Sequence, residues 1–338
     1  IATVADVMDL TEENRILVKQ GLEMLKRTSN LGLRALIQCI GLEGKKIQAY
    51  HIGFILAPCL NASGKLDTAK RALALLRAKT EREADMLAGD LKALNESRRD
   101  MTDRVVDEAM AKVERTDIRG DKVLVIYLPD CHESLAGLVA GRVRENYYRP
   151  VFVLTDSEDG VKGSGRSIES YSMYEELTGC GDLLTKFGGH PMAAGLSLDK
   201  ENVEKFKRRL NDQCTLSEEE LTEKVVIDME LPFAAITEHF IEELEYMEPF
   251  GKGNTKPVFA ARGVVMQHVK IIGKNKNVAK ATAIDAAGNR MEAICFHDAQ
   301  EFAKQCERNN GKMSITFYPG INEFRGERQI QIVITHYR

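Results

Sequence analysis

The segment FGGHPMAAG, at residues 187–195, carries side chains that could handle a phosphate group. Two adjacent glycines let a backbone pass close to a ligand, because neither has a Cβ atom. His190 follows them and can donate a hydrogen bond to a phosphate oxygen or carry a proton. A lone histidine in a turn is usually structural, but these surroundings are harder to explain by packing alone. We therefore expect Gly188, Gly189 and His190 to form a phosphate site, with a helix packed behind Ala193-Ala194-Gly195.

A second glycine-rich segment, GVKGSGRS at residues 160–167, adds hydroxyl groups and two cations. A loop of this composition can hold a phosphate through backbone N–H groups, with Ser164 beside it and Arg166 binding two oxygens at once. The segment lacks the GxxxxGK[ST] spacing of a P-loop. An ordinary hairpin turn would account for the same residues equally well, so both interpretations remain open.

Two further candidates lie nearer the N-terminus. In LNASGKL, at residues 60–66, Asn61 offers an amide and Lys65 a cation to a phosphate. An ordinary loop before a helix explains these residues as well, and the residues alone favour it. Asp6 follows a short apolar run, so it could end a strand and bind a divalent metal, or it could cap a helix. The residues alone favour a structural role here too.

Helices, a sheet and a barrel must position these groups. Residues 1–58 have a helical pattern, and Thr80 with Glu83 predicts a capping box in which each side chain bonds the other residue's backbone N–H. The helix that follows should run for about 35 residues, or roughly 50 Å. Beyond it, a strand at 122–128, a helix at 133–147 and a strand at 151–154 predict a βαβ unit in a small parallel or mixed sheet.

After Pro257, short β-rich runs separated by turn residues predict a small antiparallel barrel of about five strands, with one helix near residues 298–308. Residues 251–338 contain fourteen Lys and Arg against seven Asp and Glu, whereas residues 215–248 contain eleven acidic residues and one Lys. A basic region can attract a polyanion, although a solvated surface would look the same. Five aromatic residues in the region could stack on bases: Phe259, Phe296, Phe317, Tyr318 and Phe324. We expect most of these five to lie in the core of the barrel instead.

Length and composition indicate a globular protein of two or three domains in 338 residues. The seven cysteines are dispersed and form no CxxC pair, which argues against zinc and disulfides and favours a reducing compartment such as the cytoplasm. No apolar run could span a bilayer, so we expect no membrane association. The first residue is Ile1 rather than Met, so we expect a part of a longer chain.

In order, the motifs ATVADV, ENR, LNASGKL, the long helix, GLVAGRV, GSGRSI, FGGHPMAAG and EPFGKGN resemble the RecJ family, single-strand-specific exonucleases of the DHH phosphoesterase superfamily. The GGH and AAG elements are shared by the wider DHHA1 group, whereas LNASGKL, the long helix and EPFGKGN are more specific. The resemblance implies an α/β multidomain fold. Its expected parts are a remnant of the DHH catalytic domain (1–66), a helical connector (67–115), a DHHA1 domain with a small mixed sheet (116–214), an acidic linker (215–256) and an OB-fold β-barrel (257–338).

The resemblance also implies roles for single residues. Asp6 would be one ligand of a two-metal centre that uses Mn²⁺ or Mg²⁺, and His190 would contact the scissile phosphate. The expected substrate-binding residues are Asn61, Lys65, where Arg is common, Ser164 and Arg166 on the 5′ phosphate, and Gly188 and Gly189. The family's DxD and DHH motifs, which carry most metal ligands, are absent. We therefore expect an incomplete metal centre and little hydrolysis by this chain alone.

For the parent protein, the resemblance implies 5′-to-3′ hydrolysis of single-stranded DNA in repair and recombination. Single-stranded DNA would be the ligand, with a single-strand-binding protein or a helicase as candidate protein partners. Two rival functions remain open. A DHH oligoribonucleotide or cyclic-dinucleotide phosphodiesterase would not need the long helix or the barrel, and a nucleic-acid-binding scaffold would have lost catalysis.

Overall fold

The computed structural model describes the backbone of residues 1–66, 69–273, 275–296, 298–324 and 326–338. It divides the chain into two compact units. The sheet unit comprises residues 28–43 and 55–224, and the barrel unit comprises residues 1–27, 44–54 and 225–338. Helices, a mixed sheet and a closed barrel are all present, which confirms the expected α/β multidomain fold.

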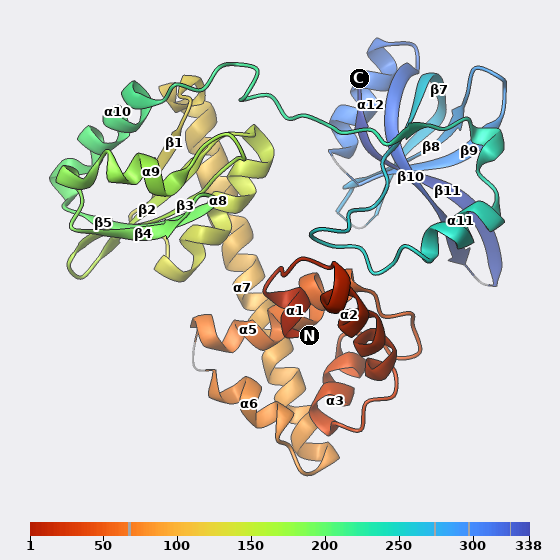
Figure 1. Ribbon diagram of the computed structural model, residues 1–338, viewed down its shortest axis with the longest axis horizontal. Helices are drawn as coiled ribbons and strands as arrows, with labels where there is room; N and C mark the ends of the chain where they lie inside the picture. The colour runs from red at the N-terminus through yellow and green to blue at the C-terminus, as the bar shows by residue number, and fades with distance from the viewer. Residues whose placement is uncertain (67–68, 274, 297, 325) are drawn as a thin grey trace. The chain divides into compact units, whose positions relative to one another are not determined.

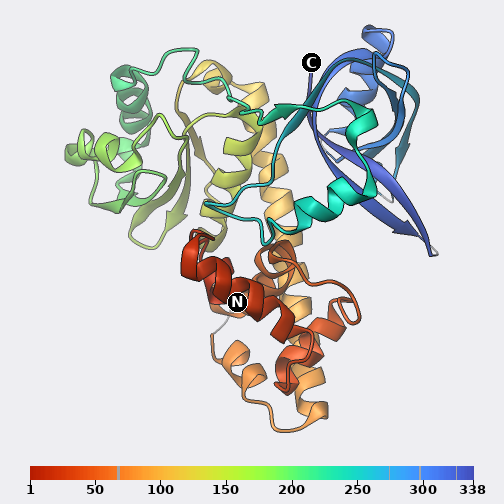
Figure 2. The same cartoon turned by 45° about the vertical axis from the view of Figure 1, so that its right-hand side comes forward.

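Helix α7 (Glu81–Arg115) runs through the sheet unit as a single element of 35 residues, as the sequence predicts (Figure 1). Thr80 accepts a hydrogen bond from the Glu83 amide at 3.2 Å, but the Glu83 carboxylate accepts from the Lys79 amide rather than from that of Thr80. The N-terminal part of α7 packs against short helices and its C-terminal part against α8 (Figures 1 and 2). These short helices are α3 (Leu31–Cys39), α5 (Ala57–Leu66) and α6 (Lys70–Leu76).

The five-stranded sheet has the order β1-β2-β3-β5-β4. Strands β1 (Leu124–Tyr127) and β2 (Val151–Ser157) are parallel and are joined by helix α8 (Glu133–Tyr147), which confirms the predicted βαβ unit. The remaining pairs are antiparallel and involve β3 (Gly160–Arg166), β4 (Lys186–His190) and β5 (Ala193–Leu198).

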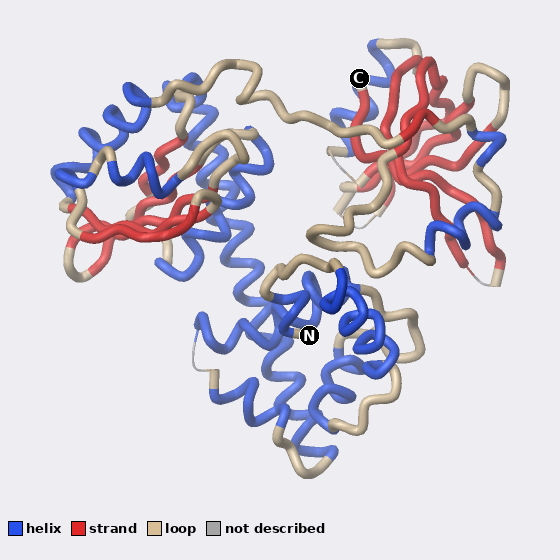
Figure 3. The backbone as a smooth tube through the Cα atoms, in the orientation of Figure 1, coloured by secondary structure: helices blue, strands red, loops and turns tan. Residues whose placement is uncertain are grey.

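Helices cover the two faces of this sheet differently (Figure 3). Val151 and Val153 of β2 pack in one core with buried residues of α7 and α8. Phe152 and Leu154 point the other way and pack with residues of α9 (Met173–Thr178) and α10 (Val203–Gln213). Edge strand β4 is exposed at all five of its residues.

One local expectation was wrong in this unit, because residues 160–166 form strand β3 rather than a loop. Ala193-Ala194-Gly195 begins strand β5, and helix α9 packs against β4 and β5, so a helix does lie behind FGGH as expected. In both segments glycines remove the side-chain alternation by which a strand is recognised. Gly163 and Gly165 lie where a Cβ would come within 2.7 Å of core side chains, so the glycines allow β3 to lie close against the core.

The barrel unit closes through pairing of β10 with β7 (Figure 1). Its elements are α1 (Ala2–Ala5), α2 (Glu12–Leu25), α4 (Ala49–His51), β6 (Met229–Glu230), α11 (Glu238–Glu245), β7 (Phe259–Ile272), β8 (Val278–Ile284), β9 (Arg290–Cys295), α12 (Ala299–Arg308), β10 (Lys312–Phe324) and β11 (Glu327–Tyr337). Because β9 and β11 are parallel, the barrel is mixed and not antiparallel as expected. The predicted helix near 298–308 is confirmed as α12.

The acidic segment 215–248 is divided between the two units: residues 225–248 belong to the barrel unit, whereas Leu216 and Leu221 are buried in a core of the sheet unit. Strand β6 pairs with β7, and Ile241 and Leu244 of α11 are buried in the barrel core. Phe259 and Phe317 are also core residues, as expected, whereas Phe296 is 59% exposed. The Phe324 side chain lies outside the described residues. The domain boundaries given above remain predictions.

The EPFGKGN segment, at residues 248–254, binds the N-terminal part of the same unit. The Leu10 amide donates to the Lys252 carbonyl at 2.6 Å, and the Lys252 ammonium lies 2.9 Å from the Asp9 carboxylate. A Cβ on Gly251 would come within 2.7 Å of the Leu10 side chain, so glycine permits this close approach.

Candidate nucleic-acid interface

Strand register gathers the predicted phosphate-binding side chains on one face of the sheet. In one row, Arg166 pairs with Ala193, which pairs with His190. In the next row, Ser164 pairs with Gly195, which pairs with Gly188. Directly paired residues share a face, and neighbouring strands lie about 4.8 Å apart. The backbones of Arg166 and His190 are therefore about 10 Å apart, with only small residues between them.

The two glycines before His190 have different roles. Gly189 has φ +155°, and a Cβ there would come within 2.4 Å of the Ala193 carbonyl oxygen. It is therefore needed for the β4–β5 hairpin itself. Gly188 has no atom within 4 Å of the position that a Cβ would take, so packing does not require glycine there. Its missing side chain leaves open space beside His190.

Arg166 is half-buried and reaches its position past helix α8. A Cβ on Gly137 would come within 2.7 Å of the Arg166 Nη2 atom. The guanidinium donates to the Gly165 carbonyl at 2.7 Å, and among the described residues no carboxylate pairs with it. Burial, and secondarily the nearby Arg144 cation, lower the pKa of Arg166, but a guanidinium stays charged at neutral pH. An unpaired, partly desolvated cation of this kind favours an anionic ligand.

His190 ends the exposed strand β4. Within the described part of the chain, its imidazole has no hydrogen-bond partner. Both ring nitrogens are therefore accessible to a ligand that crosses the sheet from Arg166. Arg166 and His190 can therefore bind the phosphates of a nucleic-acid strand at two points about 10 Å apart. The His190 imidazole can also transfer a proton.

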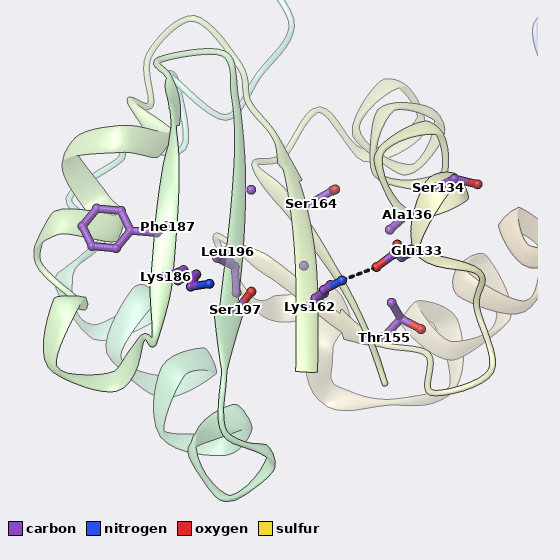
Figure 4. Close-up of a pocket in the computed structure, with 12 residues that line it drawn as sticks. Glu133, Ser134, Ala136, Thr155, Lys162, Ser164, Lys186, Phe187, Leu196 and Ser197 are labelled. Atoms are coloured by element: carbon purple, nitrogen blue, oxygen red, sulfur yellow. Dashed lines mark hydrogen bonds and ion pairs between the residues drawn. The ribbon is translucent and has the colours of Figure 1, made fainter. Parts of the chain in front are cut away.

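A cavity of about 390 Å³ continues the same face beyond Ser164 (Figure 4). Lys162 pairs with Ser197, which pairs with Lys186, so these three side chains form a third row across the sheet. The Lys162 ammonium lies 2.7 Å from the Glu133 carboxylate at the start of α8. Lys186, Ser197 and Glu133 were not predicted from the sequence. From the sequence alone, Lys162 enters only as one of two cations in a glycine-rich segment. Its two-residue spacing from Ser164 and Arg166, which is the period of a strand, is the signal that could have placed it on their face.

The other predicted residues lie elsewhere. Asn61 is exposed within helix α5 rather than in a loop. Lys65 belongs to the same helix, but its side chain lies outside the described residues. Asp6 is exposed and follows the short helix α1, where it occupies the C-terminal cap position rather than a strand end. The structure therefore does not place Asp6 in the same unit as the Arg166–His190 face.

Comparison with known proteins identifies both folded regions. Residues 120–216 match the model of the DHHA1 domain, and residues 227–336 match that of the RecJ OB domain. The single-stranded-DNA-specific exonuclease RecJ of Bacillus subtilis is 34% identical over 338 residues, which is 99% of this chain and 42% of the relative. The RecJ exonuclease of Escherichia coli K12 is 32% identical, across 99% of this chain and 59% of the relative.

A solved structure agrees with these matches. The crystal structure of RecJ from Thermus thermophilus in complex with Mn²⁺ superposes with a TM-score of 0.82 and 26% identity, covering 99% of this chain and 48% of that one. A second structure of that protein contains Mg²⁺. The chain thus spans about half the length of the relatives it matches.

The donor set of this chain does not fit such a metal centre by itself. Among the described residues, no three His, Cys, Asp or Glu side chains gather where they could hold an ion. A two-metal centre needs several carboxylate or imidazole ligands, and Asp6 offers one. What the comparisons do establish is the domain content: the chain carries a DHHA1 domain and a RecJ OB domain, and it is similar to RecJ exonucleases over 99% of its own length.

Proposed function

We propose that this chain is the substrate-holding part of a metal-dependent exonuclease that degrades single-stranded DNA from the 5′ end in repair and recombination. The observation that carries the proposal is the shared face of Ser164, Arg166 and His190. The names of the RecJ relatives support single-stranded DNA as the substrate.

Each residue then has a distinct task. Arg166 and Ser164 bind the terminal 5′ phosphate through charge-assisted hydrogen bonds, which are the stronger kind. His190 contacts the scissile phosphate, and open space at Gly188 lets the strand approach the backbone. Asn61 and Lys65 bind substrate, and Asp6 supplies one ligand to a centre for Mn²⁺ or Mg²⁺ whose other ligands are not found among the described residues.

The barrel unit guides the strand. Its region 251–338 has twice as many basic as acidic residues, so binding should weaken as salt rises and counterions compete. In the described residues, no helix has the length and hydropathy to cross a bilayer. We place the protein in the cytoplasm, with a single-strand-binding protein or a helicase as candidate partners.

The complete gene product, supplied with Mn²⁺, tests this function on a 5′-phosphorylated single strand labelled at its 3′ end. We expect the labelled strand to shorten progressively from the 5′ end, while residues 1–338 alone bind DNA and release no product. Removal from the 3′ end, or a requirement for duplex, would contradict the proposal. Preference for di- and trinucleotides over long strands would indicate an oligonucleotide phosphodiesterase instead.

A further inference from the structure

The third row of the sheet face, Lys162–Ser197–Lys186, lies in the cavity that extends from Ser164 away from Arg166 (Figure 4). Side chains two residues apart along a strand are about 6.7 Å apart, so this row is one such step from Ser164. That step is comparable to the separation of neighbouring phosphates in an extended single strand. A ligand held by Ser164 and Arg166 can therefore reach this row with a second phosphate.

Charge in the cavity favours an anion. The Lys186 ammonium has no acceptor partner among the described residues, and the Lys162 ammonium is held only by Glu133, at 2.7 Å. The cavity therefore has two cations and one carboxylate among its lining residues. The Ser197 and Ser164 hydroxyl groups add donors between and beside the two cations.

Glu133 acts as a competitor in this arrangement. The hydrogen bond and charge of Lys162 lower the pKa of Glu133, so the carboxylate stays ionised at neutral pH. An incoming phosphate must compete with it for the Lys162 ammonium. Loss of the Glu133 charge should thus strengthen phosphate binding, which a merely structural ion pair would not do.

We propose that Lys162, Ser197 and Lys186 form a second phosphate subsite, adjacent to the one proposed at Ser164 and Arg166. The inference rests on the proposed function, because the first phosphate defines where the second falls. The phosphate has two chemical sources. It is either a phosphodiester near the 5′ end, other than the scissile one at His190, or an additional phosphate on a 5′-polyphosphorylated end.

The test uses residues 1–338 and a fluorescent thymidine 12-mer with a 5′ phosphate, in which one of the first three linkages is a neutral methylphosphonate. We expect Lys186→Met to weaken binding of the unmodified strand about tenfold. A methylphosphonate at the contacted linkage should weaken wild-type binding equally but have no further effect in the variant. If the source is a polyphosphate end, wild type instead prefers a 5′-diphosphate over a 5′-monophosphate, and the variant loses that preference.

Two further variants sharpen the comparison. Glu133→Gln should strengthen binding about threefold, because a nearby half-exposed charge contributes about 0.7 kcal/mol. Lys205 lies on the exposed side of α10 and serves as the control. The effect of Lys205→Met on binding free energy should add to the effect of every methylphosphonate. Two results together would overturn the subsite. The effects of Lys186→Met and of the methylphosphonate on binding free energy would add at every linkage, and the variant would show the same preference between 5′-diphosphate and 5′-monophosphate as wild type.

Failure of the proposed function has a separate signature. If wild type binds 5′-hydroxyl and 5′-phosphate strands equally, the first phosphate site is wrong and the second falls with it. A different result would leave the proposed function standing. If wild type prefers the 5′ phosphate, but the effects of Lys186→Met and of each methylphosphonate simply add, only the second subsite is wrong.

Discussion

Gly137 of helix α8 and Arg166 of strand β3 are in such close contact that a Cβ on the glycine would lie 2.7 Å from the guanidinium Nη2 atom. The guanidinium is the end of a flexible side chain, so it can move where a backbone could not. Gly137→Ala should therefore displace Arg166 without unfolding α8. We expect about tenfold weaker binding of a 5′-phosphorylated single strand, from loss of one charged hydrogen bond.

The matched control for this change lies in the same helix. Gly141 has no atom within 4 Å of where its Cβ would be. Gly141→Ala should leave DNA affinity unchanged and raise stability by up to about 1 kcal/mol, because alanine favours helix. Fluorescence anisotropy and thermal unfolding of both variants measure the two effects. Equal affinity of the two variants would show that Gly137 does not position Arg166.

The two adjacent glycines of β4 should separate stability from binding. Gly189→Ala forces a side chain into a glycine-only backbone conformation and toward the Ala193 carbonyl, which should cost about 2–3 kcal/mol of unfolding free energy. Gly188→Ala meets open space and should cost almost nothing in stability. Urea unfolding checks both values. Gly188→Ala should nonetheless weaken DNA binding, and unchanged affinity would mean that no strand passes over Gly188.

Much of the fold follows from sequence pattern, but the register of the site does not. The α7 cap at Thr80 and the βαβ unit are local patterns, and both are confirmed. The residues of segment 160–166 are compatible with a loop or a hairpin turn, because the glycines hide the two-residue alternation of side chains that marks a strand. That Arg166 and His190 share a face depends on β5 pairing with both β3 and β4, which no local pattern encodes.

Asn61 illustrates a second limit. The small residues of LNASGKL suggest a loop by composition, yet Ala57–Leu66 is helical and buries Ala62 completely. Tertiary burial has outweighed weak local propensity in this segment. Lys186 and Ser197 were missed for a related reason, since only the folded sheet brings them beside Lys162.

Arg15 of α2 links the N-terminal helices to the barrel. Its guanidinium Nη2 atom donates to the carbonyls of Tyr246 and Met247 at 3.1 and 3.0 Å, just beyond helix α11. Arg15→Met leaves these carbonyls without that partner, and we expect a loss of about 2 kcal/mol in unfolding free energy. The exposed Arg27 serves as control, since Arg27→Met removes no comparable contact. Equal denaturation midpoints for the two variants would disprove this role for Arg15.

Asp285 should give the barrel unit a defined acid sensitivity. Burial acts to raise the pKa of this carboxyl, but hydrogen bonds from Asn289, Phe233 and Ala287 outweigh it and hold the pKa below its ordinary value of 3.8. The ionised form therefore stabilises the fold. Its contribution is complete above about pH 3.8 and is lost as pH falls through the lower folded-state pKa.

Asp285→Asn removes the charge at every pH. We expect the variant to be about 1 kcal/mol less stable than wild type at pH 7. The gap should close as pH is lowered below 3.8, where the wild-type carboxyl becomes protonated. Urea unfolding of both proteins at several pH values between roughly 2.5 and 7 measures whether this gap closes. A gap that stays constant with pH would rule out the carboxylate as its source.

The central claim is that the face shared by Arg166 and His190 binds the 5′ end of a single strand. The most direct measurement is the ratio of affinities for 5′-phosphate and 5′-hydroxyl thymidine 12-mers, in wild type and in Arg166→Met. We predict that wild type prefers the 5′ phosphate about tenfold or more and that Arg166→Met abolishes the preference. A preference that survives in Arg166→Met, or that is absent in wild type, would contradict the account.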